Sequence, residues 1–156
     1  MTALNEIGNC KIFSDSLGAL FLLSSSLLPG NEEASSEVLL SAYRRWKERP
    51  QEEWTLLNAQ RDVTVEALER AATHPQELIP TDSTAKGLPL ETSQVLALPV
   101  LERIVFLMGA VCRFGVEEIA KRLRVPSSEI RSARINAFRH LPTAASKQPT
   151  LQARTA

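Results

Sequence analysis

Apolar residues recur at every third or fourth position along most of this chain, the spacing that places them on one face of a helix. Stretches in which apolar and polar residues alternate, as they do in a half-buried strand, are few. The pair Pro29-Gly30 and the later Pro50 interrupt the helical pattern. We therefore predict an all-α fold whose N-terminal helices cover residues 11–28, 32–48 and 52–73.

The C-terminal third predicts three more helices separated by short turns. A strongly apolar stretch begins at Leu98-Pro99 and runs to about Cys112, with the proline in the first turn, where a missing amide hydrogen costs little. A short helix is expected over 116–123. The next is expected over 128–140, with Ser127 or Ser128 available as its cap.

Local composition divides the chain into segments. The stretch that follows residue 73 carries three prolines and a glycine with little periodicity, which is typical of a linker. The last fifteen or so residues are small and polar and have little to bury. We expect a helical domain at 1–73, a linker at 74–97, a second domain at 98–141 and a disordered tail at 142–156.

The net charge of zero hides an asymmetry between the two halves. Residues 1–98 hold 8 Lys and Arg against 14 Asp and Glu, a net charge of −6, whereas residues 99–156 hold 10 against 4, a net charge of +6. A split of this kind suggests two modules with different partners. The basic half is the one that could meet phosphates.

The segment from Val116 to Ile130 has the spacing of a helix-turn-helix, in which two short helices cross closely and the second presents one face to a DNA major groove. Such a crossing needs a small residue, and Ala120 supplies it. The wedge between the helices would be filled by Ile119, Leu123, Val125 and Ile130.

The second of these helices would turn polar and basic side chains outward. Its opposite, apolar stripe would consist of Ile130, Ala133, Ala137, Phe138 and Leu141. Seven Lys and Arg stand against three Glu between residues 113 and 141, a surplus that suits phosphate contact. The alternative is a plain three-helix bundle with a solvated basic face. We expect DNA contacts from Lys121, Arg124, Ser128, Arg131, Ser132, Arg134, Asn136 and Arg139.

These residues resemble region 4 of the sigma-70 family of transcription initiation factors, and most closely the extracytoplasmic-function type. The resemblance is carried by Leu98-Pro99, Glu102-Arg103, Val105-Phe106 and the run from Gly115 through Glu118-Ile119-Ala120 to Leu123. It implies that residues 98–141 dock on the promoter −35 element and on the flap of the RNA polymerase β subunit.

The N-terminal half is similar to region 2 of the same family. Residues 31–45 resemble the stretch that binds the polymerase β′ coiled coil, and the resemblance implies polymerase-binding roles for Glu32, Glu33, Glu37 and Tyr43. Residues 61–70 resemble the helix that ends region 2 and faces promoter DNA.

Several positions depart from the family pattern. Arg124 occupies the usual place of a turn glycine, so it must adopt or avoid a left-handed conformation. Positions of the recognition helix that are usually basic hold Ala133, Asn136 and Phe138. The helix that would face the melted promoter carries carboxylates, which repel phosphates, at Asp62, Glu66 and Glu69.

Other chemistry finds little support in the sequence. Cys10 and Cys112 show no metal-ligand spacing, so we interpret them as free thiols in a reducing cytoplasm. The apolar run 17–28 is too short to span a bilayer, and no secretory signal is evident. His74 and His140 have no partner at metal or triad spacing. We expect a cytoplasmic protein that is not an enzyme, with no cofactor, metal or membrane contact.

Three hypotheses follow for function. The first is a sigma-like initiation protein that binds core RNA polymerase and double-stranded promoter DNA, with an anti-sigma factor as a possible further partner. The second is a DNA-binding regulator that works outside the sigma mechanism. The third is a sigma mimic that occupies polymerase or an anti-sigma factor without reading DNA, an idea favoured by the acidic N-terminal half.

Overall fold

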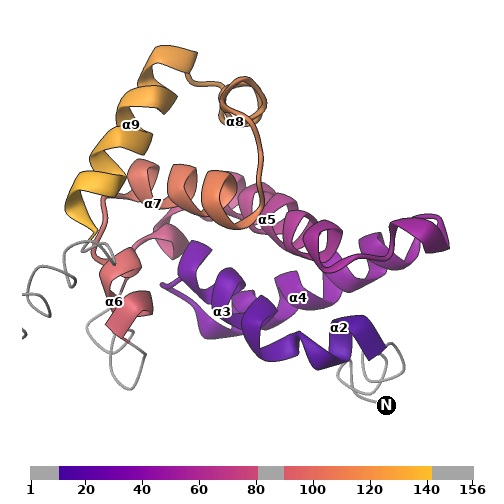
Figure 1. Cartoon of the computed structure of the whole chain (residues 1–156). Helices are drawn as coiled ribbons and strands as arrows, with labels where there is room; N and C mark the ends of the chain where they lie inside the picture. The colour runs from indigo at the N-terminus through magenta and orange to yellow at the C-terminus, as the bar shows by residue number, and fades with distance from the viewer. Residues whose placement is uncertain (1–10, 81–89, 142–156) are drawn as a thin grey trace, which may run out of the picture.

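The computed structural model describes residues 11–80 and 90–141, and this part of the chain is all-α, without strands, as predicted (Figure 1). Short turns of other helical types lie between the α-helices, at Gln51–Glu53, Pro75–Leu78 (η2) and Leu107–Val111 (η3, a π-turn). The α-helices are α2 (Lys11–Asp15), α3 (Leu17–Leu27), α4 (Glu32–Lys47), α5 (Leu56–Thr73), α6 (Leu90–Leu96), α7 (Val100–Phe106), α8 (Val116–Leu123) and α9 (Ser127–His140).

Helix α5 is the centre of the N-terminal bundle and packs against α2, α3 and α4. Side chains that accept hydrogen bonds from free backbone amides mark where α4 and α5 begin: Asn31 Oδ1 accepts from Ala34 N at 3.2 Å, and Thr55 Oγ1 accepts from Asn58 N at 3.2 Å. Trp46 is fully buried beside them, and its indole N–H donates to the Thr55 carbonyl at 3.1 Å. Trp46 therefore joins the end of α4 to the start of α5 in the core of this bundle.

The first predicted helix is divided into two. Ser16 has φ −102° and ψ 8°, which interrupts the helix between α2 and α3. The polar side chains of α3 are nevertheless compatible with burial, because they hydrogen-bond to backbone carbonyls. Ser24 donates to the Ser35 carbonyl at 3.0 Å, and Ser26 donates to the Leu22 carbonyl at 2.7 Å.

The predicted linker contains ordered structure on both sides of residues 81–89, which lie outside the described part. On the N-terminal side, the buried Glu77 of η2 accepts hydrogen bonds from Arg70 Nε at 2.8 Å and from Asn31 Nδ2 at 2.7 Å. The hydrogen bond from Arg70 is the main reason that the pKa of Glu77 is lowered. On the C-terminal side, α6 contacts α3, and Leu96 and Leu98 are buried.

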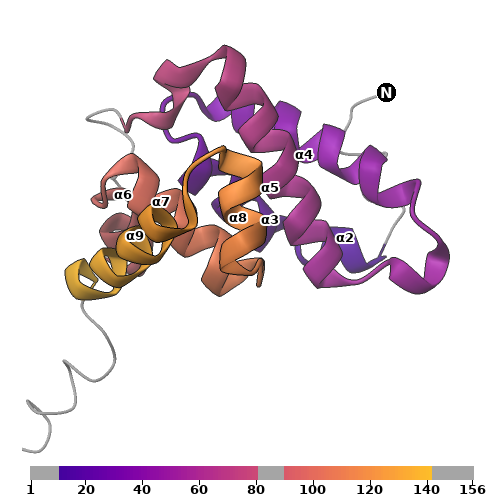
Figure 2. The same cartoon turned by 90° about the horizontal axis from the view of Figure 1, so that it is seen from above.

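Helices α8 and α9 form one end of the molecule and α2 to α4 the other, with α5 and α7 between them (Figures 1 and 2). One continuous cluster of buried apolar residues runs through both halves. Arg61 of α5 reaches across to donate to the carbonyls of Cys112 at 2.9 Å and Arg113 at 3.2 Å. The two halves therefore pack together, and their division into separate domains stays a prediction.

Arg103 of α7 is a second link between the halves. It is fully buried and donates from Nη2 to the Leu78 carbonyl of η2, whereas its Nε and Nη1 have no hydrogen-bond partner among residues 11–80 and 90–141. Burial without a counter-charge lowers the pKa of this guanidinium to about 10. Within residues 11–80 and 90–141, no helix is both long and apolar enough to cross a bilayer.

Candidate nucleic-acid interface

Helices α8 and α9 are joined by a tight turn at Arg124-Val125-Pro126. Arg124 has φ 57° and ψ 45°, so it adopts the left-handed conformation in which a glycine is usual. The turn ends α8 by letting Val125 N donate to the Ala120 carbonyl at 3.1 Å. Because Arg124 is exposed, the cost of this conformation arises from the contact of its Cβ with its own backbone.

The crossing of α8 and α9 is packed as the helix-turn-helix pattern predicts. Ala120 is buried at the crossing, and Ile119 and Ile130 are fully or almost fully buried beside it. Ala133 and Ala137 continue the buried stripe of α9, which also packs on α7. The close approach of three helices thus depends on small residues along one face of α9.

Most of the expected contact residues of α9 lie outside this stripe, although Arg134 follows Ile130 by only about 40° around the helix. Ser128, Arg131, Ser132, Arg134 and Arg139 are all exposed. Lys121 and Arg124 are exposed at the end of α8 and in the turn that follows. These side chains are therefore accessible to a ligand as large as a DNA duplex.

Phe138 is less buried than the predicted apolar stripe implies. It is 46% exposed, and its ring contacts Phe106 of α7 edge-on with centroids 5.9 Å apart. Ile135 is 53% exposed beside it. Position 138 lies a quarter-turn or so beyond the buried stripe of Ile130, Ala133 and Ala137, because one residue advances about 100° around a helix.

The flank of α9 that faces α8 holds a bridge that the sequence did not predict. Glu117, in the first turn of α8, accepts a hydrogen bond from Ser127 Oγ at 2.7 Å and from Arg131 Nη2 at 3.1 Å. Ser127 therefore does not cap α9, which begins at Ser127 after Pro126 with no side-chain cap. The predicted serine cap was wrong because α9 begins one residue earlier than expected, which places Pro126 at the N-cap position and both Ser127 and Ser128 inside the helix.

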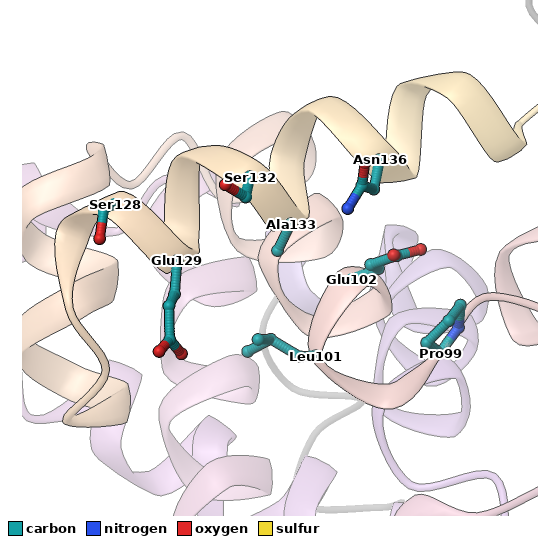
Figure 3. A pocket seen from close by; sticks show the side chains of 8 residues that line it. All are labelled: Pro99, Leu101, Glu102, Ser128, Glu129, Ser132, Ala133 and Asn136. Atoms are coloured by element: carbon teal, nitrogen blue, oxygen red, sulfur yellow. The ribbon is translucent and has the colours of Figure 1, made fainter.

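The flank of α9 that faces α7 borders a shallow groove of about 360 Å³ (Figure 3). Asn136 and Glu129 point from α9 into this groove, toward Glu102 and Leu101 of α7. Asn136 is half-buried there, so it lies on this flank and not on the outermost face. Beyond the groove, His140 Nδ1 lies 2.9 Å from Glu102 Oε2. The groove is lined by Pro99, Leu101, Glu102, Ser128, Glu129, Ser132, Ala133 and Asn136.

The expected polymerase-binding residues divide into two groups. Glu32 and Glu33 are exposed in the first turn of α4, and Glu37 is exposed one turn later, where it pairs with Arg70. Tyr43 is instead buried, with its ring 5.1 Å from that of Phe13 in a T-shaped contact. The surface role expected for Tyr43 is therefore corrected to a role in the core.

The segment expected to face melted DNA lies inside the bundle. Asp62 is 2% exposed and receives two hydrogen bonds from Arg49, at 2.9 and 3.0 Å. Glu66 and Glu69 contact Arg45 of α4 at 2.9 and 3.3 Å. The carboxylates of α5 are thus paired with arginines of the same bundle, and this helix is not free to lie against DNA.

The residues that sequence reasoning missed are those whose partners lie on a different helix. Glu117 and Arg131 are fourteen positions apart, and Glu102 and His140 are thirty-eight apart. Only the crossing geometry brings them together, so no local spacing could have revealed them. Within the described ranges, no group of three or more His, Cys, Asp or Glu side chains could hold a metal ion.

Comparison with known proteins adds no relative: no family model, no curated protein and no solved structure matches this chain.

Proposed function

We propose that this protein is a sigma-like transcription initiation protein that binds promoter DNA through α8 and α9 and core RNA polymerase through both halves. The observation that carries the proposal is the exposed surface of α9, on which Arg131, Arg134 and Arg139 are accessible while the buried stripe fixes the helix to α7 and α8. A rigid helix with a basic outer face suits the major groove, whose edges are lined by phosphates.

The charges around α9 favour one way of approaching DNA. On the α8 side, Lys121, Arg122 and Arg124 outnumber the two carboxylates of Glu117 and Glu118, whereas the groove on the α7 side contains the carboxylates of Glu102 and Glu129. Phosphates are attracted to the first side and repelled by the second. We infer that the DNA backbone runs along α8 and the turn and keeps away from Glu102 and Glu129, so that Ser128, Ser132 and Asn136, which line the groove, lie at the edge of the proposed contact.

The N-terminal bundle is proposed to supply the contact with polymerase. Glu32 and Glu33 form an exposed acidic pair at the start of α4, where carboxylates also stabilise the helix by interacting with its dipole. Because Asp62, Glu66 and Glu69 are engaged within the bundle, α5 is not proposed to melt a promoter.

A second candidate is a DNA-binding regulator outside the sigma mechanism. The position of α5 favours it, because a chain without an accessible melting helix can still recognise duplex DNA through α9. The third hypothesis, a sigma mimic that occupies polymerase or an anti-sigma factor without reading DNA, needs no melting helix either, and the exposed Glu32 and Glu33 are available to it.

The experiment is a pull-down of core RNA polymerase with the full chain, followed by a gel shift of the complex on duplex promoter DNA. Glu32→Ala with Glu33→Ala should reduce polymerase capture. Asp15→Ala with Glu52→Ala removes the same charge from exposed sites elsewhere and should leave capture unchanged. Capture with a DNA shift supports a sigma-like protein, capture without a shift supports a mimic, and a shift without capture supports the regulator.

A further inference from the structure

Glu117 spans the crossing of α8 and α9 at the end where α9 begins. Its two carboxylate oxygens are used by two different residues, Ser127 at 2.7 Å and Arg131 at 3.1 Å. Ser127 and Arg131 are four positions apart in α9 and therefore lie on the same side of that helix. The hydroxyl of Ser127 holds the carboxylate in place, and the carboxylate in turn holds the guanidinium of Arg131.

This bridge contributes little to folding stability, because the side chains of Arg131 and Glu117 are both largely exposed to solvent. The bridge instead sets the direction in which the guanidinium of Arg131 points. A guanidinium has five N–H donors in one plane, and Glu117 engages only Nη2. The donors that remain are held in a fixed orientation on the outer face of α9.

An arginine held in this way suits one base edge in particular. Guanine presents N7 and O6 side by side in the major groove, and a bidentate arginine is the commonest specific contact with them. Arg131 is the fifth residue of α9, in the N-terminal part that reaches base edges in helix-turn-helix proteins. We propose that Glu117 is a positioning residue that orients Arg131 to read a guanine in the major groove. The inference rests on the proposed DNA-binding function.

Without Glu117, Arg131 is free to turn to the nearest phosphate, a contact that carries no sequence information. Loss of the carboxylate also removes a negative charge beside the DNA backbone, which strengthens binding to any sequence. Glu117→Ala should therefore bind non-specific DNA more tightly than the wild type while discriminating less between bases.

The neighbouring Glu118 provides a matched control. It lies in the same first turn of α8 and is also exposed, but it pairs with Arg122 and not with α9. Glu118→Ala changes the net charge equally and should raise overall affinity without altering base preference. Arg131→Lys is a second variant, because lysine keeps the charge and loses the bidentate geometry.

The probe is a library of randomised DNA duplexes with fixed flanks, from which the full-length protein selects its best ligands. The wild type should select a guanine at a fixed position and prefer it over adenine by about 5- to 100-fold. Replacing that guanine with 7-deazaguanine, which lacks the N7 acceptor, should remove much of the preference. Glu117→Ala and Arg131→Lys should each reduce it several-fold, and Glu118→Ala should retain it.

The failures are distinguishable. If the wild-type chain retains no duplex, the proposed DNA-binding function is wrong and this inference is wrong with it. If the wild type binds DNA but selects no guanine, the DNA-binding function stands and the role of Glu117 is rejected. The same conclusion follows if Glu117→Ala and Glu118→Ala both prefer guanine as strongly as the wild type does.

Discussion

Asp62 is tolerated in the interior of the N-terminal bundle because Arg49 supplies two hydrogen bonds and the opposite charge. In the sequence, residues 61–70 resemble a helix that faces promoter DNA, and their carboxylates count against that role because they repel phosphates. The structure explains their presence differently, since each meets an arginine from α4 or the loop after it. At the scale of single residues, therefore, the carboxylates of α5 serve to pair this helix with Arg45 of α4 and with Arg49 in the loop after α4.

Asp62→Asn should lower the free energy of unfolding by about 1–3 kcal/mol, because it removes the charge that pairs with a partly buried arginine. Glu69→Gln is the comparison, since that carboxylate is exposed and its replacement should cost less than about 0.5 kcal/mol. Urea unfolding of both variants checks the difference, and equal costs would show that Asp62 is not stabilised by Arg49.

The thiol of Cys112 links stability to pH. Burial raises the pKa of this thiol from 9.0 to about 11. The hydrogen bond between its sulfur and Thr64 Oγ1, at 3.0 Å, offsets only part of this rise. The thiol thus ionises at lower pH in the unfolded chain than in the folded one. Between those two pKa values the unfolded state is favoured as pH rises, by up to about 1.4 kcal/mol per pH unit.

Stability should therefore be independent of this group below pH 9 and fall between pH 9 and 11. Cys112→Ala abolishes the contribution, so its unfolding free energy should fall less steeply over the same interval than that of the wild type. Chemical denaturation at a series of pH values provides the measurement. Parallel curves for the two proteins would mean that the thiol titrates normally in the folded state.

At the scale of helices, periodicity predicted most of the fold. Helix α8 matches its predicted bounds, and α4 and α9 differ by one residue at an end. The break at Ser16 and the π-turn after Phe106 were missed: no Gly or Pro stands at Ser16, and the glycine of the π-turn, Gly109, lies within a strongly apolar stretch that continues the helical pattern. For the candidate site, the exposed basic residues of α9 could be predicted from the helical spacing of its apolar positions. The bridges from Glu117 and Glu102 could not, since they depend on how helices cross.

The turn between α8 and α9 gives a prediction at this scale. Arg124→Gly should stabilise the protein by about 1 kcal/mol, because glycine adopts the left-handed conformation without a Cβ clash. Lys121→Gly, inside α8, should instead destabilise it by about 1 kcal/mol. Thermal melting separates the two cases, and destabilisation by both would indicate that Arg124 does not occupy the left-handed region in solution.

On the scale of the whole molecule, the two halves share a core and polar contacts. Arg61 binds the carbonyls that follow η3, and Arg103 binds the end of η2. Charge and composition suggest two modules with different partners, but neither property shows which buried faces meet. A shared core places α9 at one end of the molecule and α4 on the opposite half (Figure 1).

A shared core should unfold as one unit. Both tryptophans, Trp46 and Trp54, lie in the N-terminal half, so their fluorescence reports on that half alone. Far-UV circular dichroism reports on every helix. The two signals should give the same denaturation midpoint; an earlier loss of helical signal would show that α7 to α9 unfold separately and that the halves are independent domains.

The measurement that bears most directly on the central claim is the salt dependence of duplex DNA binding by the full chain. Arg134→Ala with Arg139→Ala should weaken binding and reduce the slope of log K against log salt by about 2, since each lost phosphate contact contributes roughly 0.9. Lys11→Ala with Lys47→Ala removes the same charge from the N-terminal bundle and should leave the slope unchanged. An equal slope for all three proteins, or no binding by the wild type, would contradict the assignment of α9 as the DNA-reading helix.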